Sequence, residues 1–125
     1  MTTKSQEEDP RAFLPLKPDL FHILLALSEE DLHGYGIVKA VEEATRGWLL
    51  LEPSPLYRRL RRLLEDGIVE PSRRGAASGF EDSRRQYYRL TAFGRSVLAA
   101  EAARLVDLAG MERVKVLAAG AEGAS

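Results

Sequence analysis

Apolar residues recur at helical spacing in the first half of the chain. Residues 19–28 are apolar on most sides and follow Pro18, a favoured first residue of helices. They predict a helix that is buried against several neighbours. Residues 34–47 begin with two closely spaced glycines, carry one apolar face and end at Gly47, a favourable stop. They predict a second helix, which packs by one side only.

Residues 54–67 predict a third helix with a narrow apolar face. Ser54 is the expected N-cap, Pro55 the expected first helical residue and Gly67 the expected end. On a helical wheel the leucines share one face, and these are Leu56, Leu60, Leu63 and Leu64. The short apolar run 48–52 before this helix predicts a strand or an extended link.

Two strands with alternating residues are predicted after the third helix, over 67–74 and 84–90. The segment between them, 75–83, is rich in Gly and Ser, which is typical of a hairpin loop. Alternation places Tyr88 and Leu90 on one face of the second strand, and we expect both to pack inward. The fold class is therefore mainly α with a small β-hairpin.

The ends of the chain differ in character. Residues 1–17 contain two prolines and scattered charges, and predict a flexible N-terminal arm before the domain at 18–90. Residues 91–119 are rich in Ala and Leu and predict a helix, with Thr91 as its cap and a bend or break at Gly110. Residues 120–125 are expected to be disordered.

The C-terminal helix carries more apolar surface than one small domain is expected to cover, which favours dimerisation. The alternative is packing against the first helix of the same chain. The residues assigned to a dimer interface are Phe21, Leu98, Leu105, Leu108 and Met111.

Charge is distributed unevenly, although the net charge is only -1. Residues 1–53 hold five Lys/Arg against ten Asp/Glu, whereas residues 54–89 hold nine Arg against five acids and no lysine. On the third helix Arg58 and Arg62 point directly away from the leucines, with Arg59 and Arg61 beside them. Arginine suits bidentate contact with phosphate or guanine. A merely solvated helix face is the alternative.

Composition excludes several other classes. Cys is absent, so no disulfide or thiolate metal site can form. No apolar run reaches the roughly 18 residues of a membrane span, and the first residues have no apolar signal core. We find no Gly-rich phosphate loop, no metal-ligand spacing and no nucleophile with a histidine partner. We therefore expect a cytoplasmic protein that is not an enzyme and has no cofactor, no metal and no membrane partner.

Three motifs in order resemble the PadR family of bacterial transcriptional regulators. They are LHGYGIVKAVEE, PSPLYRRLRRLLEDGIVE and RRQYYRLTAFGR, and the resemblance covers roughly residues 19–110. The chain has Ser-Pro-Leu-Tyr where the family usually has two residues between Pro and Leu, which shortens the approach to the third helix. The C-terminal part resembles the smaller subfamily, which has a single C-terminal helix.

The resemblance implies a winged helix-turn-helix with a C-terminal dimerisation helix. It further implies a homodimer that binds double-stranded DNA at an inverted-repeat operator, usually as a repressor. Some members of the family release DNA when a small-molecule effector binds near the dimer interface. The arginine-rich helix and the hairpin agree with this reading, because both elements contact DNA in winged helices.

The residues expected to bind DNA lie on three elements. Those on the second and third helices are Tyr35, Lys39, Ser54, Tyr57, Arg58, Arg59, Arg61 and Arg62. Those on the hairpin are Arg84 and Arg85, with Arg73 and Arg74 as weaker candidates. Tyr57 has an alternative role in packing at the edge of the leucine face.

Three other aromatic residues are expected to have structural roles. His33 is expected to support the entry of the second helix, and His22 to pack within its apolar run. Trp48, the only tryptophan, is expected in the core or an interface, with a platform for a planar ligand as the alternative. For the whole chain the alternative function is a protein-interaction adaptor, whose basic helix would bind an acidic partner. Preference for one DNA sequence would separate the two functions.

Overall fold

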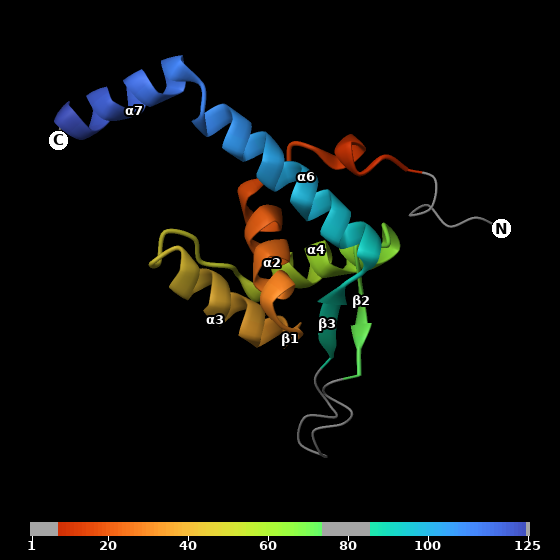
Figure 1. Ribbon diagram of the computed structural model, residues 1–125. Helices are drawn as coiled ribbons and strands as arrows, with labels where there is room; N and C mark the ends of the chain where they lie inside the picture. Colours follow the sequence, from red (N-terminus) through yellow and green to blue (C-terminus); the bar gives the residue numbers. More distant parts are fainter. Residues whose placement is uncertain (1–7, 74–85, 125) are drawn as a thin grey trace.

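The computed structural model describes residues 8–73 and 86–124 (Figure 1). It confirms a mainly helical fold with a small antiparallel sheet. The elements are η1 (Pro10–Phe13), α2 (Pro18–Glu29), β1 (Leu32–His33), α3 (Gly34–Ala44), α4 (Pro53–Glu65), β2 (Val69–Ser72), β3 (Tyr87–Leu90), α6 (Ala92–Ala109) and α7 (Glu112–Ala124). Within the described ranges no helix is both long and apolar enough to cross a membrane.

The sheet has three strands in the order β1-β3-β2. The expected hairpin is present, because β2 pairs with β3 so that Val69 faces Leu90. The additional strand β1 pairs His33 with Tyr87. Tyr88 and Leu90 are buried, as predicted. Tyr87 is buried as well, and the centroid of its ring lies 5.0 Å from that of His33 in an edge contact, so the His33 side chain packs on the face that alternation would leave open.

A single apolar core joins the helices to the sheet. α2 lies at its centre and contacts α3, α6 and β3. The leucine face of α4 is buried as predicted at Leu56, Leu60 and Leu63. The core thereby fixes which side of α4 faces outward.

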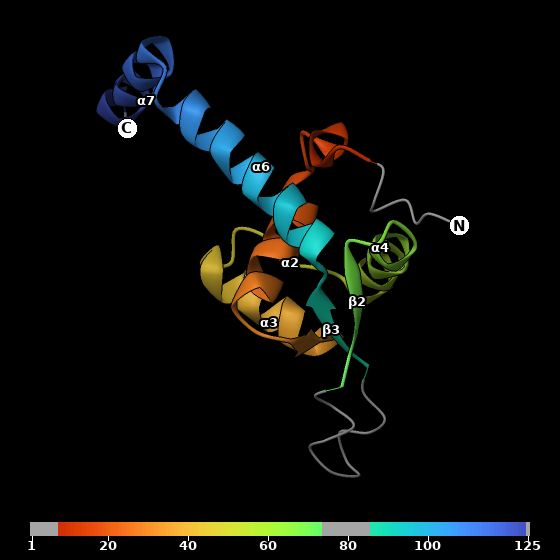
Figure 2. The ribbon, with the colours of Figure 1, turned by 45° about the vertical axis from the view of Figure 1, so that its right-hand side comes forward.

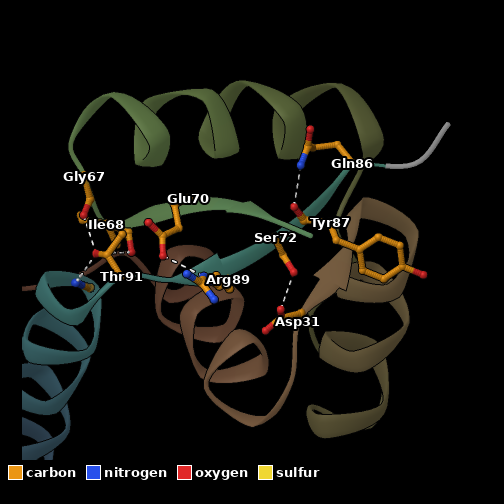
Figure 3. A network of polar contacts seen from close by, with 10 residues as sticks. Asp31, Gly67, Ile68, Glu70, Ser72, Gln86, Tyr87, Arg89 and Thr91 are labelled. Carbon is orange, nitrogen blue, oxygen red and sulfur yellow. Dashed lines mark hydrogen bonds and ion pairs between the residues drawn. The ribbon is translucent and has the colours of Figure 1, made fainter. Parts of the chain in front are cut away.

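Hydrogen bonds of Thr91 hold the start of α6 against the turn after α4 (Figure 3). Thr91 is the N-cap, as expected, and its Oγ1 accepts a hydrogen bond from the Gly94 amide at 2.9 Å. The same hydroxyl donates to the Gly67 carbonyl at 2.5 Å. A Cβ on Gly94 would lie 2.0 Å from the Ile68 carbonyl oxygen, so only glycine allows this approach. The geometry fixes α6 relative to α4 and the hairpin.

The start of α4 differs from the prediction. Glu52 is the N-cap and Pro53 the first helical residue, so Ser54 lies inside the first turn. Pro53 fits this position because its ring fixes φ, and its missing N–H would have no partner in the first turn. Ser54 is therefore an exposed residue at the helix start and not the cap. The run 48–52 is an irregular link, and the strand alternative is wrong.

The N-terminal segment, residues 8–17, also differs from the expected flexible arm. It packs beside α6 (Figures 1 and 2), where Phe13 and Phe93 meet edge to face at 5.7 Å. The Leu16 amide donates to Glu101 Oε2 at 3.0 Å. Glu101 is only 1% exposed and also accepts from Arg104 Nε at 2.6 Å. The hydrogen bonds from Arg104 and from the Leu16 amide hold the pKa of Glu101 below its ordinary value, against the opposing effect of burial.

The C-terminal part comprises two helices, not one. α6 ends at Gly110, where the expected break occurs, and α7 then runs to Ala124 and includes residues 120–124 that were expected to be disordered. Leu98 is buried in the core, so its assignment to a dimer face is wrong. Phe21 also packs against the core, although it is only partly buried. The end of α6 and α7 extend away from the domain (Figure 1), with exposed apolar residues at Leu105, Val106, Leu108, Met111, Val114, Val116 and Leu117.

Candidate nucleic-acid interface

The outward side of α4 carries three exposed arginines, of which only Arg62 has an acidic partner among the described residues. Arg58 and Arg61 are exposed, and neither forms an ion pair within residues 8–73 and 86–124. Arg62 has a side chain that is 74% exposed, and its Nε lies 3.2 Å from Asp66 Oδ2 at the end of the helix. A surface pair of this kind contributes little, so Arg62 can exchange Asp66 for another anion. The three side chains present a basic surface suited to phosphate or base edges.

Arg59 has different surroundings from the other three arginines. It forms an ion pair with Asp19 in the first turn of α2, and its side chain is 34% exposed. The reason is its position on α4, because Arg59 lies on the flank that faces the start of α2. In the structure Arg59 joins α2 and α4 through this ion pair, and its contact with DNA stays a prediction.

Tyr57 lies on the opposite flank of α4, against α3. The side chain is 47% exposed, and a Cβ on Gly34 would lie 2.4 Å from its hydroxyl oxygen. Gly34 therefore makes room for the tyrosine at the start of α3. Burial raises the pKa of the Tyr88 hydroxyl in β3, and the nearby Tyr57 raises it further. Tyr57 thus packs between α3 and the sheet while half of its surface stays open to a phosphate.

The start of α3 is held by His33, which confirms its structural role. His33 is the N-cap, and its Nδ1 accepts a hydrogen bond from the Gly36 amide at 3.0 Å. The His33 ring stacks on Tyr35 at 6.4 Å with an interplanar angle of 14°. Tyr35 is 64% exposed, and Lys39 is an exposed residue one turn later on α3. Both remain available for contact with a nucleic-acid backbone.

The base of the hairpin is fixed by polar contacts (Figure 3). Arg89 Nε donates to Glu70 Oε2 at 2.8 Å, across the β2–β3 pair. Ser72, at the end of β2, donates a short hydrogen bond to Asp31, which precedes β1. Arg73 is exposed immediately after β2. The other predicted hairpin arginines lie outside the described residues, and these are Arg74, Arg84 and Arg85.

Trp48 is not in the core. Its side chain is 73% exposed and that of Leu50 is 61% exposed, on the link between α3 and α4. The sharp turn before Trp48 uses positive φ angles at Arg46 (53°) and Gly47 (82°). The core expectation for Trp48 is wrong, and interface and ligand-platform roles stay predictions. His22 is partly buried and lines a cavity of about 360 Å³ between α2 and α3, in keeping with packing.

Two carboxylates that hold the surrounding structure together could not be found by sequence reasoning. Asp19 signals only a helix start, and Glu101 looks like any charged residue on a helical face. Asp19 pairs with Arg59, 40 positions away, and Glu101 accepts from Leu16, 85 positions away. Within the described residues no group of His, Cys, Asp and Glu could hold a metal ion.

Comparisons with known proteins agree on the fold. The model of the transcriptional regulator PadR-like family matches residues 23–100. A complex of H. salinarum RosR superposes with a TM-score of 0.65 at 24% identity, over 93% of this chain and 98% of that chain. A transcriptional regulator from Clostridium thermocellum gives 0.60 at 26% identity, over 79% and 88%. The transcriptional repressor CouR, bound to a 23-mer DNA duplex, gives 0.54 at 22%, over 93% and 80%. No curated protein matches the sequence significantly.

Proposed function

Since the chain belongs to the PadR-like family of transcriptional regulators, we propose that it acts as a dimeric repressor at an inverted-repeat operator. In this proposal α4 enters the major groove of each half-site, and the hairpin lies along the adjacent backbone. The observation that carries it is the pair of exposed arginines, Arg58 and Arg61, on the side of α4 that points away from the core.

The supporting contacts are assigned by position. Tyr57 and Ser54 lie at the start of α4, where the helix dipole favours phosphate. Tyr35 and Lys39 on α3 reach the backbone across the groove, and Arg73 does so from the base of the hairpin. These side chains are exposed and lie on elements that the core holds rigidly, which favours a pre-formed interface.

Sequence discrimination tests the DNA part of the proposal. Fluorescence anisotropy should be measured at physiological salt with duplex DNA from the region upstream of the protein's own gene and with a scrambled duplex. A specific regulator should prefer its operator by about 10³-fold or more. Equal, weak binding to both duplexes would contradict the proposal and would favour an adaptor with an acidic protein partner.

The dimer part rests on the exposed apolar residues of α6 and α7. Leu105 lies where α6 leaves the domain, and its side chain is 36% exposed. Leu105→Asp should give a monomer in sedimentation velocity and weaken binding to a two-half-site operator far more than to one half-site. Ala103→Asp is the matched control, because Ala103 lies about 200° round the helix from Leu105. A Leu105→Asp variant that stays dimeric would place the interface elsewhere.

A further inference from the structure

The start of α2 brings a carboxylate to the flank of the proposed DNA surface. Asp19 lies in the first turn of α2, and its Oδ1 accepts a hydrogen bond from the Leu20 amide at 2.8 Å. The other oxygen, Oδ2, forms the ion pair with Arg59 Nε. A negative charge is favoured at this end of a helix. The backbone of α2 and the arginine of α4 together fix the position of the carboxylate.

The ion pair of Arg59 leaves this arginine less accessible than Arg62. The side chains of Arg59 and Asp19 are 34% and 21% exposed. The side chain of Arg62, by contrast, is 74% exposed beside Asp66. Water and salt screen a partly buried pair less than an exposed one. We therefore expect a phosphate to compete for Arg62 more easily than for Arg59.

Arg59 nevertheless lies beside the arginines that face outward. It lines a shallow depression of about 160 Å³ together with Pro55, Arg58 and Arg62. A phosphate in this depression would approach all three arginines. Without a carboxylate beside it, Arg59 would offer that phosphate a planar pair of N–H donors. Asp19 instead occupies Arg59 and places a negative charge close to the depression.

The number of phosphates that a protein neutralises sets its affinity for DNA of any sequence. On an operator, base contacts fix the register of α4, so an arginine on its flank gains affinity only where a phosphate lies opposite it. On other DNA the protein can shift along the backbone until each free arginine is paired. A free Arg59 would therefore favour DNA outside the operator more than the operator itself.

We propose that Asp19 is a specificity-determining residue, which withholds Arg59 from the phosphate backbone and thereby lowers the affinity of the protein for non-operator DNA. Loss of the carboxylate should free Arg59 and tighten binding to DNA of any sequence. A purely structural role of the ion pair predicts the opposite sign, because loss of the link between α2 and α4 would displace α4 and weaken binding. The claim about specificity rests on the proposed function, whereas the withholding of Arg59 requires only that the protein binds DNA.

Asp19→Asn tests the proposal, because asparagine keeps the shape of the side chain and an oxygen that accepts from the Leu20 amide. Anisotropy on a scrambled duplex should show binding that is about three- to tenfold tighter at physiological salt, and a slope of log affinity against log salt that is steeper by about one unit. Operator affinity should rise less, so the ratio of the two affinities should fall. Unchanged or weaker binding to the scrambled duplex would overturn the proposal, and an equal gain on both duplexes would overturn its claim about specificity.

Two further variants separate the ion pair from net charge. Arg59→Ala added to Asp19→Asn should abolish the gain, because no arginine is then freed. Asp107→Asn makes the same change in net charge on the exposed part of α6 that extends away from the domain, about 200° round the helix from Leu105. Salt screens this position from DNA at α4, so binding should stay unchanged. A gain that survives Arg59→Ala, or that Asp107→Asn reproduces, would mean that Asp19 acts only through net charge and would contradict the proposal.

The proposed function and this inference fail in different ways. If the wild type binds operator and scrambled duplex equally, the proposed function is wrong, while the slope for Asp19→Asn on the scrambled duplex still decides whether Asp19 withholds Arg59. If the wild type prefers the operator and Asp19→Asn behaves like the wild type, only the inference is wrong. Circular dichroism checks that each variant is folded. Should Asp19→Asn be unfolded, Asp19→Ser carries the same expectation, because serine also suits the start of a helix.

Discussion

The arginines of α4 fall into two groups that differ in their surroundings. Arg58 and Arg61 are exposed and have no ion-pair partner within the described residues, whereas Arg59 and Arg62 lie beside carboxylates of α2 and of the helix end. All four occur within five positions of the sequence. A cluster of like charges therefore does not act as a unit, because the helix distributes its members between the solvent and the neighbouring elements.

We therefore expect the two groups of arginines to contribute differently to DNA binding. An exposed arginine without a partner offers its full charge to DNA, while a paired arginine must first give up its carboxylate. Arg62 is the intermediate case, since its pair with Asp66 is largely exposed and weak. The comparison predicts that DNA affinity depends most on Arg58 and Arg61 and least on Arg59.

The largest effect is expected from removing the exposed pair. Arg58→Ala combined with Arg61→Ala should lower operator affinity by about a hundredfold or more, because each lost phosphate or base contact costs about 1–3 kcal/mol. Arg62→Ala should have a smaller effect, and Arg59→Ala the smallest. Anisotropy titrations of the four proteins against one operator duplex give the order. If Arg59→Ala loses as much operator affinity as the double variant, the proposed difference between the two groups of arginines is wrong.

A second, smaller effect is expected at Gly34, which positions the other flank of α4. Gly34→Ala would bring a methyl group against the Tyr57 hydroxyl. The half-exposed ring can swing outward, so the stability cost should be only about 1 kcal/mol while DNA affinity falls about tenfold. Thermal unfolding and anisotropy measure the two quantities.

Gly36→Ala is the matched control for this prediction. A Cβ there would approach the Leu32 side chain to 3.2 Å, which a small shift of that side chain relieves. We expect Gly36→Ala to leave DNA affinity within about twofold, since alanine is favoured over glycine in helices. Equal losses from both substitutions would show that Tyr57 has no special part in the interface.

The last prediction concerns stability and not DNA affinity, where no effect is expected, and it involves a buried counterpart to the exposed ion pairs of α4. Hydrogen bonds from Arg104 and the Leu16 amide lower the pKa of Glu101 in the folded protein. Its contribution to stability is therefore complete above the ordinary glutamate pKa and is lost as the pH falls through the depressed pKa. Glu101→Gln should lower stability near pH 7 by about 1–3 kcal/mol and flatten the decline in acid.

Urea unfolding at a series of pH values measures this decline. Glu43→Gln, at an exposed position of α3, is the control and should follow the wild-type curve. If Glu101→Gln declines in acid as steeply as the wild type, the attachment of the N-terminal segment to α6 does not depend on this carboxylate.

Much of the fold was predictable because periodic patterns report local structure. The leucine spacing of α4 fixed its buried face, and Thr91 marked the start of α6. The two-residue strand β1 was not predictable, since it is too short for any alternation. The helical backbone of 120–124 was also missed, because Gly and Ala there suggested a tail.

The candidate site was predictable only in outline. The wheel placed Arg58 outward correctly, but it could not reveal that Asp19 would lie beside Arg59, because that contact depends on how α2 packs against α4. The start of α4 was misplaced by two residues because two prolines, Pro53 and Pro55, both fit the first helical position. Contacts such as the Arg59–Asp19 ion pair follow from tertiary packing and leave no local pattern in the sequence.

The salt dependence of operator binding tests the central claim most directly. Log affinity should be measured against log salt for the wild type, Arg61→Ala and Arg59→Ala. If Arg61 contacts a phosphate and Arg59 does not, the slope for Arg61→Ala should be shallower by about one unit and that for Arg59→Ala unchanged. An unchanged affinity and slope for Arg61→Ala, with a shallower slope for Arg59→Ala, would contradict the account.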